Sequence, residues 1–148
     1  MVKPILIAED FEPDAKLLEL ALKHAGVTNP LFFVPDGHQA VCYLKGEGIY
    51  RDRKAFPLPG VLMLDLKMPV AGGFEVLEWC HTQPYLEDLM IVVLSGYHEL
   101  REVNRAYQLG AKTFLAKPMS EGDILEMIRT YPGPWQISKP GSSRSSAS

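Results

Sequence analysis

Cysteine is scarce in this chain of 148 residues, which contains only Cys42 and Cys80. The two stand apart, without the close spacing of a cysteine metal site. We interpret both as buried or half-buried thiols, which suits a reducing cytoplasm. The four histidines are scattered without ligand spacing and are interpreted as surface side chains: His24, His38, His81 and His98. The spacing of the cysteines and histidines therefore predicts no zinc site.

Long apolar runs and a strong excess of one charge are also missing. No apolar stretch approaches the ~20 residues needed to span a bilayer, and the N-terminus shows no signal-peptide core followed by a cleavage site. The net charge of -3 gives no electrostatic reason to expect nucleic-acid binding. We therefore expect a cytoplasmic protein whose partners include neither a membrane nor a nucleic acid.

What the chain does contain is an alternation of short β-rich apolar runs with longer helical patterns. The apolar runs are 3–8, 31–34, 61–64, 90–94 and 112–116. Such alternation predicts one α/β domain with a parallel sheet and helices on both faces. Right-handed crossovers and a reversal of order near the first strand predict a doubly wound, flavodoxin-like fold, with five strands in the order 2-1-3-4-5.

Two segments fall outside this alternation. The connector 46–60 is longer than the ~2–6 residues usual in α/β units, and two interpretations stay open: a solvated surface loop or an insertion that contacts a partner. After Tyr131, prolines and serines exclude regular structure. The predicted domain therefore covers residues 1–131, and residues 132–148 form a Pro/Ser-rich tail that is largely disordered. Trp135 is the exception, and we expect it to pack onto its own domain.

Three carboxylates follow two of the predicted buried strands. Glu9 and Asp10 follow the first run, and Asp65 follows the third. Because the C-terminal ends of neighbouring parallel strands share one edge, these side chains should converge there. Carboxylates ~5 Å apart repel by roughly 3 kcal/mol at an effective dielectric near 20. They need a cation, and oxygen ligands without histidine or cysteine favour Mg²⁺ over Zn²⁺.

Ser95 and Lys117 end the fourth and fifth predicted strands at the same edge. An ammonium group can meet one phosphoryl oxygen, and a hydroxyl group can donate a hydrogen bond to another. A carboxylate such as Asp65, surrounded by a divalent cation, an ammonium and a hydroxyl, is equipped to act as a nucleophile on phosphorus. The Lys117–Pro118 bond is a candidate cis peptide that would aim the lysine inward.

In the order and spacing of these residues, the chain resembles the receiver domain of two-component response regulators, of the stand-alone type. The resemblance covers roughly residues 1–131. The residues that carry it are Glu9-Asp10, Asp65 followed by Leu66-Lys67-Met68-Pro69, Gly73, Ser95-Gly96, and Phe114-Leu115-Ala116-Lys117-Pro118.

The resemblance implies that Asp65 accepts a phosphoryl group from the phosphohistidine of a sensor histidine kinase. It implies that Asp10, Asp65 and the backbone carbonyl of Lys67 bind Mg²⁺ directly, while Glu9 acts through water. Lys117 would pair with the phosphoryl oxygens.

The resemblance also implies two switch residues, because Ser95 would move toward the aspartyl phosphate and Phe114 would repack in response. Phe114 departs from the frequent Tyr or Thr of the family, so no hydroxyl is present there. With no room for a DNA-binding domain after Tyr131, we expect the output surface around Ser95, Leu100, Tyr107 and Phe114 to be read by an unknown downstream protein.

The connector 46–60 resembles that of stand-alone regulators that serve phytochrome-type or other hybrid kinases. A homodimer through the fourth helix, fifth strand and fifth helix is also compatible with the sequence.

Three alternatives stay open beside the phosphorylation-dependent binding switch. They are a phosphorelay shuttle that donates to a histidine phosphotransfer protein, a Mg²⁺-dependent aspartyl phosphatase, and a phosphate-independent interaction module. The phosphatase class uses an Asp-x-Asp pair, and Lys67 stands where its second acid belongs. We therefore expect no enzyme beyond self-catalysed phosphorylation and dephosphorylation.

Overall fold

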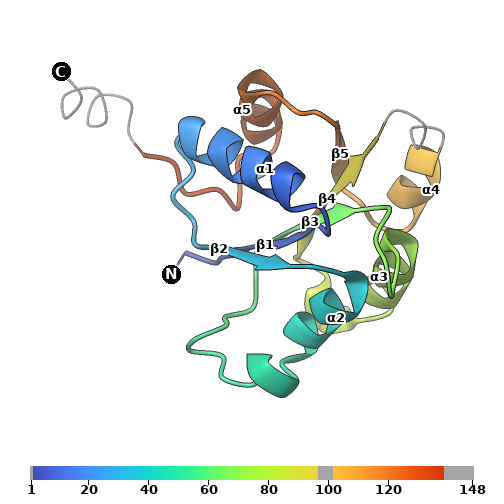
Figure 1. The fold of residues 1–148 in the computed structure, drawn as a ribbon. Helices are drawn as coiled ribbons and strands as arrows, with labels where there is room; N and C mark the ends of the chain where they lie inside the picture. Colours follow the sequence, from blue (N-terminus) through green and yellow to red (C-terminus); the bar gives the residue numbers. More distant parts are fainter. Residues whose placement is uncertain (1, 97–101, 139–148) are drawn as a thin grey trace.

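The computed structural model describes residues 2–96 and 102–138, which are built around a single five-stranded sheet (Figure 1). Its strands are β1 (Ile5–Ala8), β2 (Leu31–Val34), β3 (Val61–Asp65), β4 (Met90–Ser95) and β5 (Thr113–Ala116). All neighbouring strands pair in parallel, in the order β2-β1-β3-β4-β5. The predicted doubly wound, flavodoxin-like fold is confirmed, including its strand order.

Helices cover both faces of this sheet. Figure 1 shows α1 and α5 over one face and α2 and α3 over the other. The helices are α1 (Glu12–His24), α2 (Gly37–Lys45), α3 (Gly73–His81), α4 (Val103–Gln108) and α5 (Glu121–Thr130), with short 3-10 turns η1 (Gly48–Tyr50) and η2 (Pro84–Leu86). Ala106 of α4 packs in the same apolar layer as α2 and α3. The start of the predicted fourth helix, around Leu100, lies outside the described residues.

The central strands are buried on both faces, because their side chains alternate between two apolar layers. Leu6 and Leu62 pack in the layer that contains α2 and α3, whereas Ile5 and Met63 pack in the layer that contains α1 and α5. All four have an exposed fraction of 0%. Strands of this kind have room for polar side chains only where they end, and the site forms there.

The connector 46–60 folds back and enlarges the core. Tyr50 and Phe56 pack against Tyr43 of α2, with ring centroids 5.1 and 5.9 Å away, and Phe32 of β2 lies 5.7 Å from Tyr43. Tyr43 and Tyr50 are buried. The interpretation as a solvated loop is therefore wrong for the inner side of the connector. Contact with a partner through its outer side stays a prediction.

Arg53 fastens the connector to the end of α2. Its Nη1 donates to the carbonyl oxygen of Tyr43 (2.8 Å) and its Nη2 to that of Leu44 (2.7 Å). Nη1 also lies 3.1 Å from the carbonyl oxygen of Phe56 in the connector itself. Because the last carbonyl groups of a helix lack partners within it, the guanidinium group acts as a cap that joins two segments.

Residues 132–138 differ from the predicted disordered tail. Trp135 is buried, as expected for packing onto its own domain, and its Nε1 donates to the carbonyl oxygen of Tyr131 (2.9 Å). Ile137 forms an antiparallel bridge with Val27. The side chain of Asn29 donates to the carbonyl oxygen of Pro134 and accepts from the backbone N–H of Gln136. These contacts hold the segment against the loop before β2, and the rest of the predicted tail lies outside the described residues.

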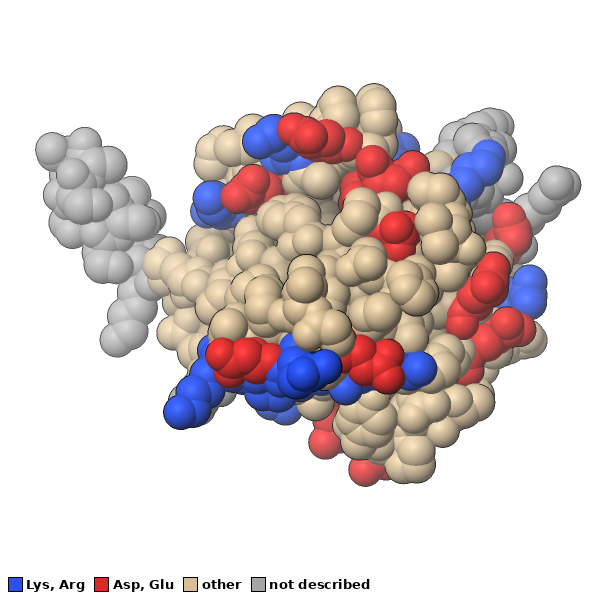
Figure 2. Space-filling model, turned by 60° about the horizontal axis from the view of Figure 1, so that its bottom comes forward, with Lys and Arg blue, Asp and Glu red and all other residues tan. Residues whose placement is uncertain are grey.

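The two cysteines and the described histidines follow the sequence expectations. Cys80 is buried and Cys42 is half-buried. His24, His38 and His81 are exposed, while His98 lies outside the described residues. None of the described helices is long and apolar enough to cross a membrane. On the face shown in Figure 2, acidic and basic side chains are interspersed around a broad uncharged area.

Candidate functional site

Asp65 ends β3, and the segment after it is held close to the sheet. Leu66 N donates to the carbonyl oxygen of Leu94 in β4 (3.1 Å), and Gly73 N donates to that of Leu66 (3.0 Å). A Cβ atom on Gly73 would lie 2.7 Å from the carbonyl oxygen of Asp65. Only glycine therefore permits α3 to begin this close to the end of β3.

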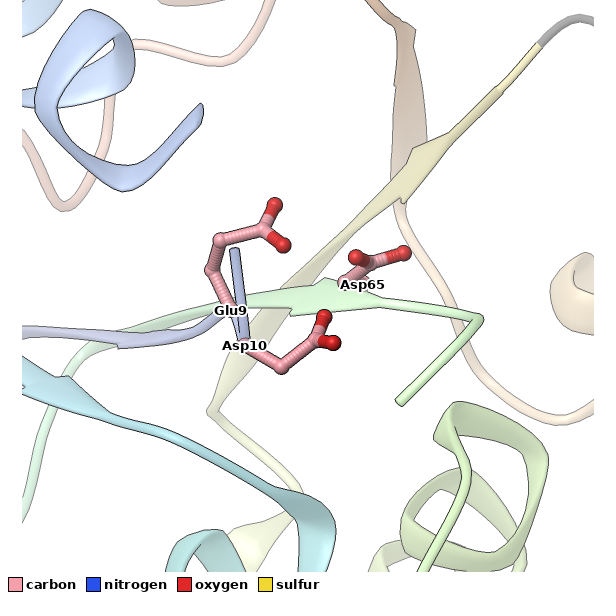
Figure 3. Close-up of side chains that lie close together, drawn as sticks. All are labelled: Glu9, Asp10 and Asp65. Carbon is pink, nitrogen blue, oxygen red and sulfur yellow. The ribbon is translucent and has the colours of Figure 1, made fainter. Parts of the chain in front are cut away.

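Three carboxylates meet at this edge of the sheet. Glu9 and Asp10 follow β1, which pairs with β3, and Figure 3 shows their side chains close to that of Asp65. One oxygen from each residue lies within 4.8 Å of the others. Charges at this distance repel by about 3 kcal/mol at an effective dielectric near 20. The all-oxygen donor group fits a hard divalent cation, and the fold brings the predicted metal-binding side chains together.

Lys117 supplies positive charge to the same place. Its Nζ lies 2.6 Å from Oε1 of Glu9 and 2.8 Å from Oδ2 of Asp65. The backbone N–H of Lys117 donates to the carbonyl oxygen of Ser95 (2.8 Å), which joins the ends of β5 and β4. The Lys117–Pro118 peptide is cis, as the sequence predicts. The ammonium group of Lys117 therefore contacts Asp65, and its role toward a phosphoryl group stays a prediction.

Burial and neighbouring charge shift two pKa values in the site. Burial raises the pKa of Glu9 to about 7, and its hydrogen bond with Asp65 acts in the same direction, against Lys117. Burial lowers the pKa of Lys117, but its hydrogen bonds with Asp65 and Glu9 outweigh burial and hold that pKa above its ordinary value. The ammonium group therefore stays charged at neutral pH. Burial thus disfavours the charged form of Glu9, and a cation bound beside it would favour that form.

Ser95 lies at the end of β4 with no exposed surface. Among the described residues, its Oγ is the one buried side-chain nitrogen or oxygen without a hydrogen-bond partner. An unpaired buried hydroxyl group costs roughly 1–3 kcal/mol. In the adjacent strand, Asp65 stands opposite Leu94, the neighbour of Ser95. The hydroxyl group of Ser95 is therefore available to donate a hydrogen bond to a phosphoryl oxygen on Asp65. That contact stays a prediction.

Phe114 is the second residue of β5 and stands opposite Val93 of β4. Its ring is half-buried and meets Tyr107 of α4 edge to face, with centroids 6.4 Å apart. Tyr107 is exposed. The predicted output surface thus has a physical contact between α4 and β5, although Leu100 lies outside the described residues. The switch role of Phe114 stays a prediction.

The sequence reasoning missed Asp14. Its Oδ2 lies 3.1 Å from Nζ of Lys117, although the residue belongs to the first turn of α1. A carboxylate in the first turn commonly complements the helix dipole, so its position carried no sign of this contact. The carbonyl oxygen of Lys67 was predicted to bind Mg²⁺, and this stays a prediction. The backbone N–H of Lys67 donates to Oδ1 of Asp65 (3.0 Å).

Comparison with known proteins assigns the family. The family model of the response regulator receiver domain matches residues 5–129 of the sequence. The chain belongs to this family. The receiver-domain residues predicted from the sequence all lie within the matched range.

Three relatives illustrate the similarity. The chain is 30% identical to the response regulator Rcp1 of Synechocystis sp. over 133 residues, which cover 90% of this chain and 88% of Rcp1. The bacteriophytochrome response regulator RtBRR has a similar structure, with 33% identity and a TM-score of 0.83 over 97% of this chain and 88% of RtBRR. The phosphorylated cyanobacterial phytochrome response regulator RcpA gives 25% identity and a TM-score of 0.77, covering 94% of this chain and 100% of RcpA. A structure of Rcp1 in a Mn²⁺-bound form is also known. Compared with this chain it has 28% identity and a TM-score of 0.74, and the match covers 93% of this chain and 99% of that structure.

Proposed function

We propose that the chain is a response regulator that accepts a phosphoryl group on Asp65 from a sensor histidine kinase and then binds a downstream protein. The observation that carries the proposal is the setting of the Asp65 carboxylate. The side chain has an exposed fraction of only 4%, and its two oxygens accept separately from Lys117 and from the backbone of Lys67. A carboxylate held in one orientation beside a permanent cation is prepared for attack on phosphorus.

This placement supports a direct transfer. An oxygen of Asp65 attacks the phosphorus of the donor phosphohistidine, and a P–O bond forms as the P–N bond breaks. The bonding electron pair returns to the imidazole nitrogen, which takes up a proton as it leaves. Lys117 offsets the charge on the phosphoryl oxygens, and the hydroxyl group of Ser95 donates to one of them. Later attack by water on the phosphorus releases phosphate and restores Asp65.

Asp10, Asp65 and the carbonyl oxygen of Lys67 are the groups that would hold Mg²⁺ directly, and Glu9 would act through water. When bound, the cation neutralises charge on the carboxylates and on the transferring group. Two observations support a divalent cation at this place: the convergence of the three carboxylates, and the Mn²⁺-bound form of the relative Rcp1.

The donor that best fits the chain is a phytochrome-type histidine kinase. RtBRR and RcpA are named as phytochrome response regulators, and the chain resembles both over nearly its full described length. The readout would be the surface that carries Tyr107 and Phe114, where α4 packs on β5. A change in the packing of Phe114 would alter this surface without any change in the sheet.

The test is phosphotransfer from phosphorylated candidate kinases, with Asp65→Asn as the loss-of-function variant. Asp88→Asn is the matched control, because Asp88 is an exposed aspartate that precedes β4, at the opposite end of that strand from Ser95. We expect wild type and Asp88→Asn to label in Mg²⁺ and not in EDTA, with an acid-stable, base-labile bond. Equal labelling of Asp65→Asn would refute the assignment of Asp65.

The same labelled protein separates the alternatives. Transfer of the label onward to a histidine phosphotransfer protein would indicate a shuttle and not an end-point switch. Turnover of a generic phosphate ester at an enzymatic rate would favour a phosphatase, although Lys67 occupies the position of the second acid. Absence of any labelling, together with no binding of beryllofluoride, would favour a phosphate-independent module.

A further inference from the structure

The ammonium group of Lys117 is shared by three carboxylates, and one of them comes from outside the strand ends. Glu9 lies 2.6 Å from Nζ, Asp65 2.8 Å and Asp14 3.1 Å. An ammonium group has three N–H donors and no acceptor. The three carboxylates in contact with the ammonium group equal its N–H donors in number, so Lys117 has no fourth donor for a phosphoryl oxygen.

Phosphorylation removes the negative charge of the Asp65 carboxylate, so the donor that contacts Asp65 passes to the phosphoryl group. A second donor for the phosphoryl oxygens must come from Glu9 or Asp14. The side chain of Glu9 has an exposed fraction of only 2%, so water cannot replace Lys117 there. The side chain of Asp14 is 34% exposed and makes the longest of the three contacts. Water can solvate Asp14 when it is released, so its contact is the least costly to break.

The surroundings of Asp14 give it room to move. A pocket of about 170 Å³ lies between α1 and the segment after β5, and Asp14, Lys117, Leu17 and Met119 are among the residues that line it. Leu17 is exposed beside it. Asp14 therefore borders free space on the side of Lys117, and its side chain is not enclosed by packing.

We propose that Asp14 is a positioning residue that holds Lys117 when Asp65 is unmodified and competes with the phosphoryl group for the ammonium. This inference rests on the proposed phosphorylation of Asp65. Asp14 makes the ammonium group of Lys117 less available to a phosphoryl group. It thereby weakens the binding of that group and affects how readily Asp65 returns to its unmodified form. Removal of the carboxylate frees one N–H donor of Lys117 for the phosphoryl oxygens.

The first test is the affinity for beryllofluoride in saturating Mg²⁺, measured by fluorine NMR on the full chain. Asp14→Asn should bind roughly two- to fivefold more tightly, the size expected for loss of a competing, partly exposed ion pair. Asp14→Glu keeps the charge and should restore the wild-type affinity. The matched control is Glu19→Gln, because Glu19 is a carboxylate of the same helix that pairs with Lys23 (3.1 Å) and not with Lys117.

The second test follows the side-chain carboxyl carbon resonances of the wild-type protein. Addition of beryllofluoride should shift the resonance of Asp14, because its carboxylate loses the lysine, and should leave that of Glu19 in place. An Asp14 resonance that does not move, or an unchanged or weaker affinity in Asp14→Asn, overturns the inference but leaves the proposed function intact. Failure of the wild-type protein to bind beryllofluoride overturns the proposed function and the inference with it.

Discussion

Gly73 lies so close to Leu66 that a Cβ atom on the glycine would come within 2.6 Å of the Leu66 Cα atom. Real Cβ atoms do not approach backbone atoms this closely, so the turn from β3 to α3 must open when Gly73 acquires a side chain. This turn carries Asp65 at one end, and its geometry sets where the carboxylate lies.

We therefore expect Gly73→Ala to lower the free energy of unfolding by about 1–3 kcal/mol, the usual cost of overpacking. Mg²⁺-dependent labelling of Asp65 should also slow. Urea denaturation and labelling kinetics measure the two effects. Gly72→Ala is the control, since a Cβ there would meet only the carbonyl oxygen of Leu66, at 3.8 Å. Equal behaviour of the two variants would contradict this account of the turn.

Arg53 gives a second prediction, about the connector. Arg53→Met keeps an unbranched side chain but removes the hydrogen bonds to the carbonyl oxygens of Tyr43 and Leu44. We expect a loss of about 2 kcal/mol in the free energy of unfolding, because hydrogen bonds to charged groups are worth ~1.5–3 kcal/mol. Urea denaturation measures it, with Arg51→Met as the exposed control. An Arg53→Met variant as stable as this control would show that the connector is not held by the guanidinium group.

The two thiols should differ in reactivity. Burial raises the pKa of Cys80 to about 12, so at pH 8 only about one Cys80 thiol in 10⁴ is ionised in the folded protein. Because the thiolate is the reactive form, iodoacetamide at pH 8 should modify half-buried Cys42 and spare Cys80 until the protein is denatured in urea. Peptide mass spectrometry follows both sites. Rapid modification of Cys80 under native conditions would contradict its burial.

Much of the site was predictable because it depends on sheet topology alone. Glu9, Asp10 and Asp65 each follow a buried strand, and parallel pairing of β1 with β3 brings the ends of these strands together. The same rule placed Ser95 and Lys117 at that edge. These predictions needed only the alternation of apolar runs and the identity of the residue at each strand end.

The parts that were not predictable depend on contacts without a periodic pattern. Asp14 has the sequence signature of an ordinary first-turn acid, and only the coordinates place it on Lys117. Arg53 stands in a charged connector that resembles any solvated loop. Asn29 binds the backbone of residues more than 100 positions away, and no local signal marks such a pair. Trp135 itself was expected to pack onto the domain, but the pairing of its neighbours with Val27 and Asn29 was not.

The central claim is that Asp65, and no other carboxylate, receives the phosphoryl group. The most direct measurement is labelling with acetyl phosphate and Mg²⁺, reduction of the acyl phosphate with borohydride, and tandem mass spectrometry of the peptides. Reduction converts a phosphorylated aspartate to homoserine, so the modified position is read from the peptide mass. The account predicts homoserine at position 65, dependent on Mg²⁺. A reduced carboxyl at Glu9 or Asp10, or none at position 65 in protein that carries label, would contradict it.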